Sequence, residues 1–438
     1  MKILYKILRA LNFICPTSDM RRKYRQYMDF HINGNEIEIL QANYAKVIER
    51  IKNKKSKIKA VFLVSENQKW NWQSVYDDME KSDDFEPVVL ITNIYLKKKD
   101  DIRLSETTLQ ENYDFFKKRN MKVEYAYVPE TNTYIPLSEF EPDLIFYQQP
   151  WSIHPDQSLL KTSEYALSCY VPYGIPVCDI GSEYDINFYR MVWAYFEINQ
   201  DMYDFLEKKD KNLVKNHVVC GHPKLDTYFE KAEPKNEHDK DYIIYAPHHS
   251  FFPAHLNLAT FKWNGEYILQ YAKEHPELKF VFKPHPWLKA TLIKRHIMTK
   301  QEADNYYKEW ENTGIYCDSA DYFDIFKKSK LMITDCASFL VEYFPSTHPV
   351  IHLRNKFSPK FLPMLKTITD CYYQAYNLDE LKQFFELLLE KNNDILRQKR
   401  LETIDKMKFL DEKTSKRILS YLRNSLRSKV LSHGIETA

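Results

Sequence analysis

Short apolar runs rich in β-branched and aromatic residues recur along most of the chain, and polar stretches with helical spacing separate them. The first of these runs are IKAVFLVSE at 58–66, EPVVLIT at 86–92 and KVEYAYV at 122–128. A run that is apolar at nearly every position predicts a strand buried on both faces, whereas alternation marks a strand with one wet face. Strands and helices that alternate at this spacing therefore predict parallel, doubly wound sheets.

The length of 438 residues exceeds what one hydrophobic core usually serves, so we expect two domains. A polar stretch at 231–240 separates two series of strands and helices and predicts the linker. We assign 1–57 to an N-terminal helical segment, 58–230 to the first α/β domain, 241–378 to the second, and 379–438 to basic C-terminal helices. Two doubly wound, Rossmann-like domains with C-terminal helices describe a GT-B-like architecture, although the alternation alone also suits other two-domain α/β folds.

The net charge is only +2, but both ends of the chain are basic. Residues 1–26 carry seven Lys/Arg and one acidic residue, and residues 394–438 carry eleven Lys/Arg and six acidic residues. This asymmetry predicts an anionic surface as a partner of the ends. We do not expect nucleic acid as that partner, because no nucleic-acid-binding motif is present and the acidic body would repel phosphates.

The N-terminus combines apolar residues at helical spacing over 3–11 with basic residues on the other side of the predicted helix. Such a helix suits the surface of an anionic membrane, and the alternative is that its apolar face docks on the protein body. We find no convincing signal peptide and no uninterrupted apolar run of about 18 residues. Seven cysteines without a CxxC pair predict reduced thiols. We therefore expect a cytoplasmic protein, peripheral on the inner face of the cell membrane.

Polar residues follow several predicted strands of the second domain, where ligands of open parallel sheets bind. The segments are PHHS at 247–250, KPHP at 283–286 and TDCAS at 334–338. Lys283 supplies a positive charge, and His285, stiffened by flanking prolines, can donate to a phosphate oxygen. The chain has only seven glycines and neither a GxGxxG nor a Walker pattern, so these segments predict a phosphate pocket without a glycine loop.

The remaining candidates of the second domain lie in the same segments. Ser338 stands where the next helix should begin, as its N-cap, and backbone N–H groups there favour an anion. Asp335 and Glu342 are candidates to hold the hydroxyls of a ribose or a sugar. All have structural alternatives: a rigid turn, a helix cap, or a hydrogen-bonded residue at a strand end. His248 and His249 suggest a metal ion, but adjacent side chains of an extended segment point apart, so we expect no metal.

In their order and spacing, IIYAPHHS, FKPHP and TDCASFLVEYF resemble motifs of the CDP-glycerol glycerophosphotransferase family, the teichoic acid polymerases and primases. CGHPKLD at 220–226 is similar to that family's Gly-aromatic-Pro-Arg/Lys-x-Asp turn. The His-Pro and Ser motifs are also similar to those that hold CMP in bacterial sialyl- and polysialyltransferases. The resemblance covers roughly residues 140–355. It implies a GT-B fold, His285 and Ser338 on the donor phosphates with Lys283 assisting, and CMP as the leaving group.

The sequence departs from the family at a second functional histidine, which lies in a Trp-His-Gly-Thr segment and is thought to activate the acceptor hydroxyl. The matching segment is YVPYGIP at 170–176, which has Tyr173 before the glycine. Tyrosine is a poor base unless its pKa is strongly depressed. His154, His248 and His249 are the other candidates for the base.

Together these features predict a transferase that moves a glycerol-phosphate or glycosyl unit from a CMP/CDP-activated donor. The acceptor would be a cell-surface glycan or its lipid-linked precursor, in capsule, teichoic-acid-like or lipopolysaccharide biosynthesis. We expect no cofactor besides the activated donor, which the second domain would bind, with the acceptor on the first. Two alternatives stay open: a GT-B glycosyltransferase that uses a UDP- or GDP-sugar, and a catalytically inactive scaffold of a polysaccharide assembly complex.

Overall fold

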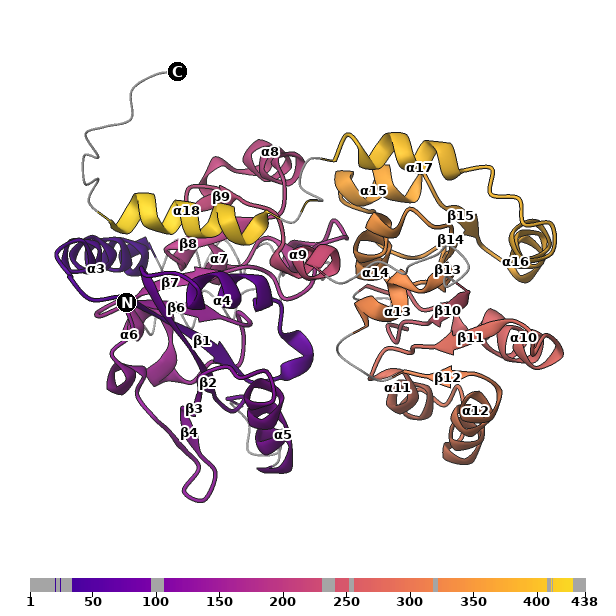
Figure 1. Ribbon diagram of the computed structural model, residues 1–438, viewed down its shortest axis with the longest axis horizontal. Helices are drawn as coiled ribbons and strands as arrows, with labels where there is room; N and C mark the ends of the chain where they lie inside the picture. Colours follow the sequence, from indigo (N-terminus) through magenta and orange to yellow (C-terminus); the bar gives the residue numbers. More distant parts are fainter. Residues whose placement is uncertain are drawn as a thin grey trace. The chain divides into compact units, whose positions relative to one another are not determined.

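The computed structural model separates into two compact units, each with its own sheet (Figure 1). Unit 1 comprises Met1–Tyr173, Tyr184–Lys224 and Lys413–Ala438, and unit 2 comprises Gly174–Glu183 and Leu225–Glu412. The residues that the structure describes are Met20, Tyr24, 34–95, 106–230, 241–251, 256–317, 322–407, Asp411 and 413–427.

Unit 1 contains a seven-stranded sheet in the order β3-β2-β1-β6-β7-β8-β9, and all neighbouring strands are parallel. Its strands are β1 Ile58–Val64, β2 Phe85–Ile91, β3 Val123–Tyr125, β6 Leu144–Tyr147, β7 Leu167–Tyr170, β8 Ala194–Glu197 and β9 His217–Val219. A short hairpin adds β4 Tyr127–Val128 and β5 Thr133–Tyr134. Its helices include α3 Gly34–Lys52, α4 Gln73–Glu80, α5 Glu106–Lys117, α6 Leu159–Thr162, α7 Asn187–Met191, α8 Gln200–Lys209 and α18 Thr414–Leu426.

Unit 2 contains a six-stranded parallel sheet in the order β12-β11-β10-β13-β14-β15. Its strands are β10 Tyr242–Ala246, β11 Lys279–Phe282, β12 Ile315–Tyr316, β13 Ser329–Thr334, β14 Val350–Leu353 and β15 Tyr373–Ala375. Its helices are α10 Phe261–Glu274, α11 Leu288–Lys294, α12 Lys300–Thr313, α13 Phe323–Lys327, α14 Ala337–Glu342, α15 Pro363–Thr369, α16 Leu378–Phe385 and α17 Arg397–Ile404. Helix α9, Pro223–Glu230, begins in unit 1 and ends in unit 2.

The buried strands confirm the predicted fold class of two doubly wound α/β domains. In β1, six of the seven residues are buried, as the uninterrupted apolar run predicts. The order of strands reverses between β1 and β6 in unit 1, and between β10 and β13 in unit 2. The carboxyl ends of the strands at such a reversal are where ligands of open sheets bind, so the fold directs attention to these two edges.

The N-terminal helix and the C-terminal helix both pack into unit 1. Apolar positions of α3 reach the core at Leu40, Tyr44 and Val47, so α3 is part of unit 1 instead of a separate segment. Helix α18, yellow in Figure 1, packs against α3 and α4 and buries Leu419 and Leu422 in the same core. Apolar spacing predicts which face of such a helix is buried, but not the distant partner that buries it. The predicted helix over 3–11 lies outside the described residues.

The boundaries of the two units differ from the expected ones near a crossing segment, Gly174–Glu183, which belongs to unit 2 although both of its neighbours belong to unit 1. Backbone bonds hold it there: the N–H of Leu362 donates to the carbonyl of Val177 at 2.9 Å. The predicted C-terminal domain is also divided, because α17 belongs to unit 2 and α18 to unit 1. The boundary between the main bodies falls after Lys224, before the predicted linker.

Two further expectations concern cysteines and membrane crossing. The six cysteines among the described residues are buried free thiols, as predicted. None of the helices in the described ranges is long and apolar enough to cross a membrane.

Candidate functional site

Three histidines from two neighbouring strand ends meet in unit 2. His248 and His249 follow β10, and His285 follows β11. The rings of His249 and His285 stack with centroids 4.1 Å apart, and His248 lies 4.8 Å from His249 and 4.9 Å from His285. The expectation that His248 and His249 point apart is wrong. Residues 247–250 have left the strand, so the alternation of an extended segment no longer applies.

Asp335, the first residue after β13, anchors the backbone of His248 and so positions this cluster. Its Oδ1 accepts the backbone N–H of His248 at 2.5 Å, and its Oδ2 accepts the N–H and the hydroxyl of Thr260 at 2.6 and 2.7 Å. The side chain is 1% exposed, and this burial raises its pKa to about 6. Because both carboxylate oxygens are engaged by the chain, the geometry favours an anchoring role for Asp335 over the predicted contact to a ribose or sugar.

Backbone N–H groups decide which nitrogen carries the proton in two of the three rings. Trp287 donates its N–H to Nδ1 of His285 at 3.1 Å, and Ser250 donates its N–H to Nδ1 of His248 at 3.2 Å. A ring nitrogen that accepts an N–H is unprotonated, so a neutral ring then carries its proton on Nε2. His248 and His285 therefore present Nε2–H groups that donate hydrogen bonds without carrying charge.

Burial and mutual repulsion keep the cluster neutral. Burial, followed by the charges of His249 and Lys283, lowers the pKa of His285 to about 3. Burial and the two neighbouring histidines lower the pKa of His248 well below its usual range, and burial lowers that of His249. All three rings are therefore unprotonated at neutral pH.

The spacing of the three rings also raises the question of a metal ion, because their nitrogen atoms lie within 4.8 Å of one another. A ligating nitrogen must offer a lone pair, and its partner nitrogen usually donates to an acceptor. In His248 and His285 the partner nitrogen instead accepts a backbone N–H, which leaves the proton on Nε2. The donor set therefore fits a metal poorly and suits an oxyanion.

Lys283 and Glu342 lie among buried groups of the same edge. Lys283 is 7% exposed, and its Nζ lies 4.7 Å from the centroid of the Tyr322 ring. The hydroxyl of Tyr322 donates to the carboxylate of Glu342, which is also buried. Lys283 thus places a buried positive charge directly after the end of β11. Glu342 is hydrogen-bonded within the chain, and its predicted role toward a sugar hydroxyl stays a prediction.

Ser338 lies two positions past the helix cap at which it was predicted. Helix α14 begins at Ala337, and Cys336 occupies the cap position without a side-chain capping bond. The expectation that Ser338 is the N-cap is therefore wrong. Its hydroxyl is half-buried and lies 3.5 Å from the sulfur of Cys336, so a contact to a donor phosphate stays a prediction.

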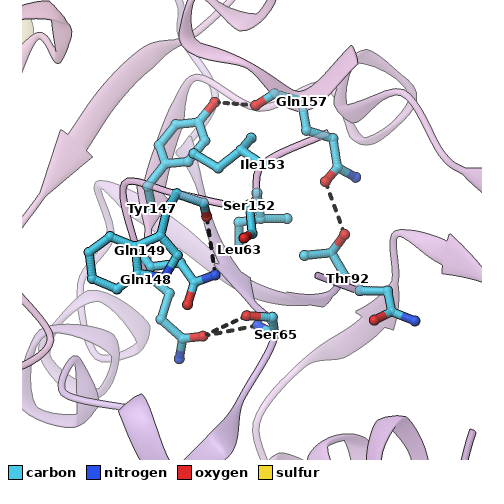
Figure 2. Close-up of a pocket in the computed structure, with 11 residues that line it drawn as sticks. Leu63, Ser65, Thr92, Tyr147, Gln148, Gln149, Ser152, Ile153 and Gln157 are labelled. Carbon is cyan, nitrogen blue, oxygen red and sulfur yellow. Dashed lines mark hydrogen bonds between the residues drawn. The ribbon is translucent and has the colours of Figure 1, made fainter. Parts of the chain in front are cut away.

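The corresponding edge of unit 1 carries uncharged polar side chains around a cavity of about 20 Å³ (Figure 2). Gln148 follows β6, and its Oε1 accepts the N–H groups of Ser65 and Glu66 at 3.0 and 3.1 Å. Across the cavity, the hydroxyl of Thr92 donates to Oε1 of Gln157 at 2.9 Å. Figure 2 shows both amides reaching the ends of neighbouring strands. These amides cross-link the strand ends through neutral hydrogen bonds.

The two candidate bases of unit 1, His154 and Tyr173, are packed against aromatic rings and do not line that cavity. His154 stacks on Tyr134 at 4.1 Å and accepts the N–H of Asp156 at Nδ1, 3.3 Å away. Tyr173 packs edge-on against Trp151 at 5.9 Å, with the Nζ of Lys69 lying 5.4 Å from its ring centroid. Their catalytic roles stay predictions.

The turn at 220–226, one of the motifs behind the family resemblance, has a structural role, and its residues 220–224 belong to unit 1. Gly221 has a φ of 99°, and a Cβ there would lie 2.5 Å from the hydroxyl of Thr414. Nε2 of the buried His222 bonds the carbonyl of Pro172 at 2.8 Å, and Nδ1 accepts the N–H of Lys224. Burial lowers the pKa of His222 to about 3. This histidine therefore fixes the chain that follows β7.

Sequence reasoning missed two residues at the unit 2 edge. Thr260, which holds Asp335, gave no signal because it lies in a loop far from any predicted strand end. Arg354 directly follows β14. The rule that identified His285, inspection of the residue after each strand, would have identified Arg354 if it had been applied to PVIHL at 349–353.

No protein-family model matches this chain, and the search of curated proteins gives no match. Solved structures do match. The UDP-GlcNAc 2-epimerase of Neisseria meningitidis bound to UDP-GlcNAc has a TM-score of 0.54 and 14% identity, over 84% of this chain and 100% of that one. The H548A variant of the wall teichoic acid polymerase TagF has a TM-score of 0.52 and 14% identity, over 97% and 98%. S. aureus MnaA with UDP has a TM-score of 0.51 and 13% identity, over 84% and 97%.

The chain has a GT-B-like fold. The presence of TagF among its structural neighbours confirms the predicted resemblance to teichoic acid polymerases at the level of the fold. At this sequence identity, the likeness does not extend to a substrate or a reaction.

Proposed function

We propose that the protein is a transferase that moves a glycerol-phosphate or glycosyl unit from a CMP/CDP-activated donor to a hydroxyl of a cell-envelope glycan or its lipid-linked precursor. One observation carries the proposal: Nδ1 of His248 and Nδ1 of His285 each accept a backbone N–H, which leaves an Nε2–H on each neutral ring. His248 follows β10, where the strand order of unit 2 reverses, and His285 and the buried Lys283 follow the neighbouring β11. The fold that the chain shares with the wall teichoic acid polymerase TagF is compatible with this class of reaction.

The leaving group determines what this arrangement has to do. CMP leaves as a phosphate, a weak base that needs charge stabilisation more than protonation. The Nε2–H groups of His248 and His285 donate to its oxygens, and the charge of Lys283 adds to the stabilisation. Asp335 holds the His248 loop before the donor arrives, so little reorganisation is needed during the reaction.

His249 is our proposed base, because the other candidates are unsuited to accept a proton. Nδ1 of His248 accepts a backbone N–H, so Nε2 of its neutral ring is protonated, and Nδ1 of His154 is engaged by the N–H and the carboxylate of Asp156. Among the described residues, Nδ1 of His249 contacts the hydroxyl of Thr291, at a long 3.5 Å, and a hydroxyl can adapt to either tautomer. Because burial lowers its pKa, the ring of His249 is unprotonated at neutral pH and can therefore accept a proton.

The edge of unit 1, whose cavity is lined by uncharged residues, is the proposed acceptor side. Amide and hydroxyl groups such as those of Gln149, Thr92 and Ser65 recognise hydroxyl-bearing ligands without requiring charge. Trp151 also lines the cavity and is 44% exposed, which leaves an aromatic surface for a sugar ring.

A UDP-sugar is the second candidate donor, because two of the structural neighbours are bound to UDP or UDP-GlcNAc. Titration calorimetry with CMP, CDP, UDP and GDP separates the two. We expect binding of the cytidine nucleotides only, and preferential binding of UDP would replace our donor assignment. Release of CMP on addition of any acceptor would exclude the inactive scaffold.

Membrane association of the basic ends forms a separate part of the proposal. Several arginines of the C-terminal stretch are engaged within the protein: Arg423 pairs with Asp84 at 2.7 Å, and Arg417 donates to the carbonyl of Cys220 at 3.0 Å. The basic residues within 1–26 are therefore the better candidates for an anionic leaflet. We expect the full chain, but not a chain that lacks 1–26, to sediment with anionic vesicles. Equal sedimentation of both would contradict this assignment.

A further inference from the structure

Arg354 lies at the same strand-end edge as the histidine cluster. It follows β14, which pairs with β13, and β13 pairs with β10. The Nδ2 of Asn355 donates to the carbonyl of Ala259 at 3.4 Å, so the loop after β14 contacts the loop after β10. The next residue, Thr260, holds Asp335 and through it His248. A short chain of contacts therefore links Arg354 to the cluster.

Aromatic rings fix the position of the Arg354 guanidinium. Its central carbon lies 4.6 Å from the ring centroid of Phe361 and 5.7 Å from that of Tyr376. The backbone of Phe361 forms an isolated β-bridge with Cys178 of the crossing segment, and this bridge fixes the position of Phe361. A guanidinium that packs on a ring keeps the N–H groups at its edge available for hydrogen bonds in its own plane, the geometry that binds a phosphate through two oxygens.

The chain does not neutralise this cation. Within the described part of the molecule, no carboxylate pairs with Arg354, and its buried Nε has no acceptor. Arg400 shows the usual arrangement: its guanidinium pairs with Asp394 and donates to the carbonyl of Thr347 at 2.8 Å. A buried N–H without an acceptor is unfavourable, so the arrangement at Arg354 favours an anion that the chain itself does not supply.

A neighbouring histidine shows the same lack of a partner. His352, in β14, and Arg354, directly after it, both lie beside the ring of Phe361. Nδ1 of the buried His352 has no hydrogen-bond partner among the described groups, and its ring lies 5.7 Å from that of Phe361. Beside Phe361, Nε of Arg354 thus lacks an acceptor, and Nδ1 of His352 lacks a hydrogen-bond partner among the described residues.

We propose that Arg354 binds a phosphate of the nucleotide-activated donor, with its permanent charge complementing the uncharged Nε2–H groups of His248 and His285. This inference rests on the proposed function, because it assigns a further phosphate-binding residue to the same donor site. The histidines are neutral and contribute only hydrogen bonds, so the positive charge that binds the phosphate has to come from Lys283 and Arg354.

Calorimetry on three variants of the full chain tests this assignment. Arg354→Met removes the charge and keeps an apolar stem over Phe361, and Arg354→Lys keeps the charge but loses the planar fork. Lys356→Met is the matched control, because it removes one charge from an exposed position on the same loop. The probes are CDP, CMP, inorganic pyrophosphate and cytidine.

We expect Arg354→Met to weaken the binding of CDP and pyrophosphate by roughly 10- to 100-fold and to leave cytidine unchanged. Arg354→Lys should lie between this variant and the wild type, and Lys356→Met should stay within about twofold of the wild type. Wild-type affinity for CDP and pyrophosphate in a folded Arg354→Met protein would overturn the inference. If that variant does not fold, unchanged affinities in Arg354→Lys would overturn it instead.

The probes separate this inference from the proposed function. Binding of pyrophosphate that depends on Arg354, without any gain from cytidine, would support the inference and reject the cytidine donor. Equal binding of CDP by the wild type and Arg354→Met would reject the inference and leave the proposed function intact. No binding of nucleotide or pyrophosphate to the wild type would reject both.

Discussion

The two units place different chemistry at the same position of the same kind of sheet. At the edge of unit 2, the buried His248 and the partly buried His285 are ionisable and held neutral, with Lys283 beside them. At the edge of unit 1, Gln148 and Gln157 form neutral hydrogen bonds with neighbouring strand ends. The difference shows that the topology only positions a site. The residues after the strands decide whether that site suits an anion or an uncharged partner.

The two edges also share a way of being held together. Asp335 joins the loop after β10, the start of α10 and the end of β13. Gln148 joins the ends of β6 and β1. In each unit one buried side chain after the central strands fixes the loops of the edge. In unit 2 the fixed loop carries His248, and in unit 1 it carries Glu66, which pairs with Lys69.

The largest effect should come from His249, the proposed base of the unit 2 edge. His249→Gln removes the proton acceptor and keeps a polar side chain. We expect kcat to fall by about 10²- to 10⁴-fold while the affinity for CDP is retained. In the wild type, activity should fall as the pH drops through the lowered pKa of His249, below about 6.5, and the variant should lack this dependence. His154→Gln is the matched change in unit 1, and an equal loss there would reassign the base.

His285→Ala should be nearly as severe, because it removes an Nε2–H donor from the leaving phosphate. We expect kcat to fall by about 10²- to 10³-fold, with weaker binding of CDP and little change in the melting temperature. His275, which lies at the end of α10 and pairs with Glu277, offers the control His275→Ala. Full activity of His285→Ala would refute the donor site.

Substitutions of the two anchoring residues, Asp335 and Gln148, should both lower the stability of the fold, but only the change at Asp335 should weaken the binding of CDP. Asp335→Asn and Gln148→Met each remove a buried acceptor of backbone N–H groups, so each should cost about 1–3 kcal/mol in the free energy of unfolding. Only Asp335→Asn should also weaken CDP binding, by about tenfold, because it weakens the bonds that anchor the segment at 247–250, which carries His248. Denaturant unfolding and calorimetry measure the two quantities. A comparable loss of CDP affinity in Gln148→Met would remove the distinction between the edges.

The smallest expected effect is a difference between the two edges in how their stability depends on pH. The folded-state pKa values of His248 and His285 are depressed, so below about 6.5 the unfolded chain binds more protons than the folded one. Their contribution to stability is therefore present above pH 6.5 and is lost as the pH falls below it, by about 2 kcal/mol for His285 at pH 5. Hydrogen exchange, corrected for intrinsic rates, should show weaker protection of the His248 loop at pH 5 than at pH 7. The loop after β1 should show no such change.

The sequence predicted the strands and the position of the site because both depend on local pattern. The runs at 58–66 and 242–247 are nearly the observed β1 and β10, since residues buried on both faces must be apolar. The exchange of segments between the units was not predictable in this way. Whether Gly174–Glu183 or α18 joins one unit or the other depends on packing between residues far apart in the chain.

The geometry of the site exceeded what the sequence could predict for a similar reason. The convergence of His248 and His249 depends on a change of backbone direction after β10, and their tautomers depend on single N–H groups of Ser250 and Trp287. Neither is encoded in residue type or spacing.

The central claim is that His248 and His285 are neutral Nε2–H donors that bind the donor phosphate. Nitrogen NMR of the protein labelled at histidine measures protonation and tautomer directly, with and without CDP. We expect both rings to remain neutral with the proton on Nε2 from pH 5 to 8, and their Nε2–H signals to shift when CDP is added. Rings that titrate near pH 6.5, carry the proton on Nδ1, or do not respond to CDP would contradict the account.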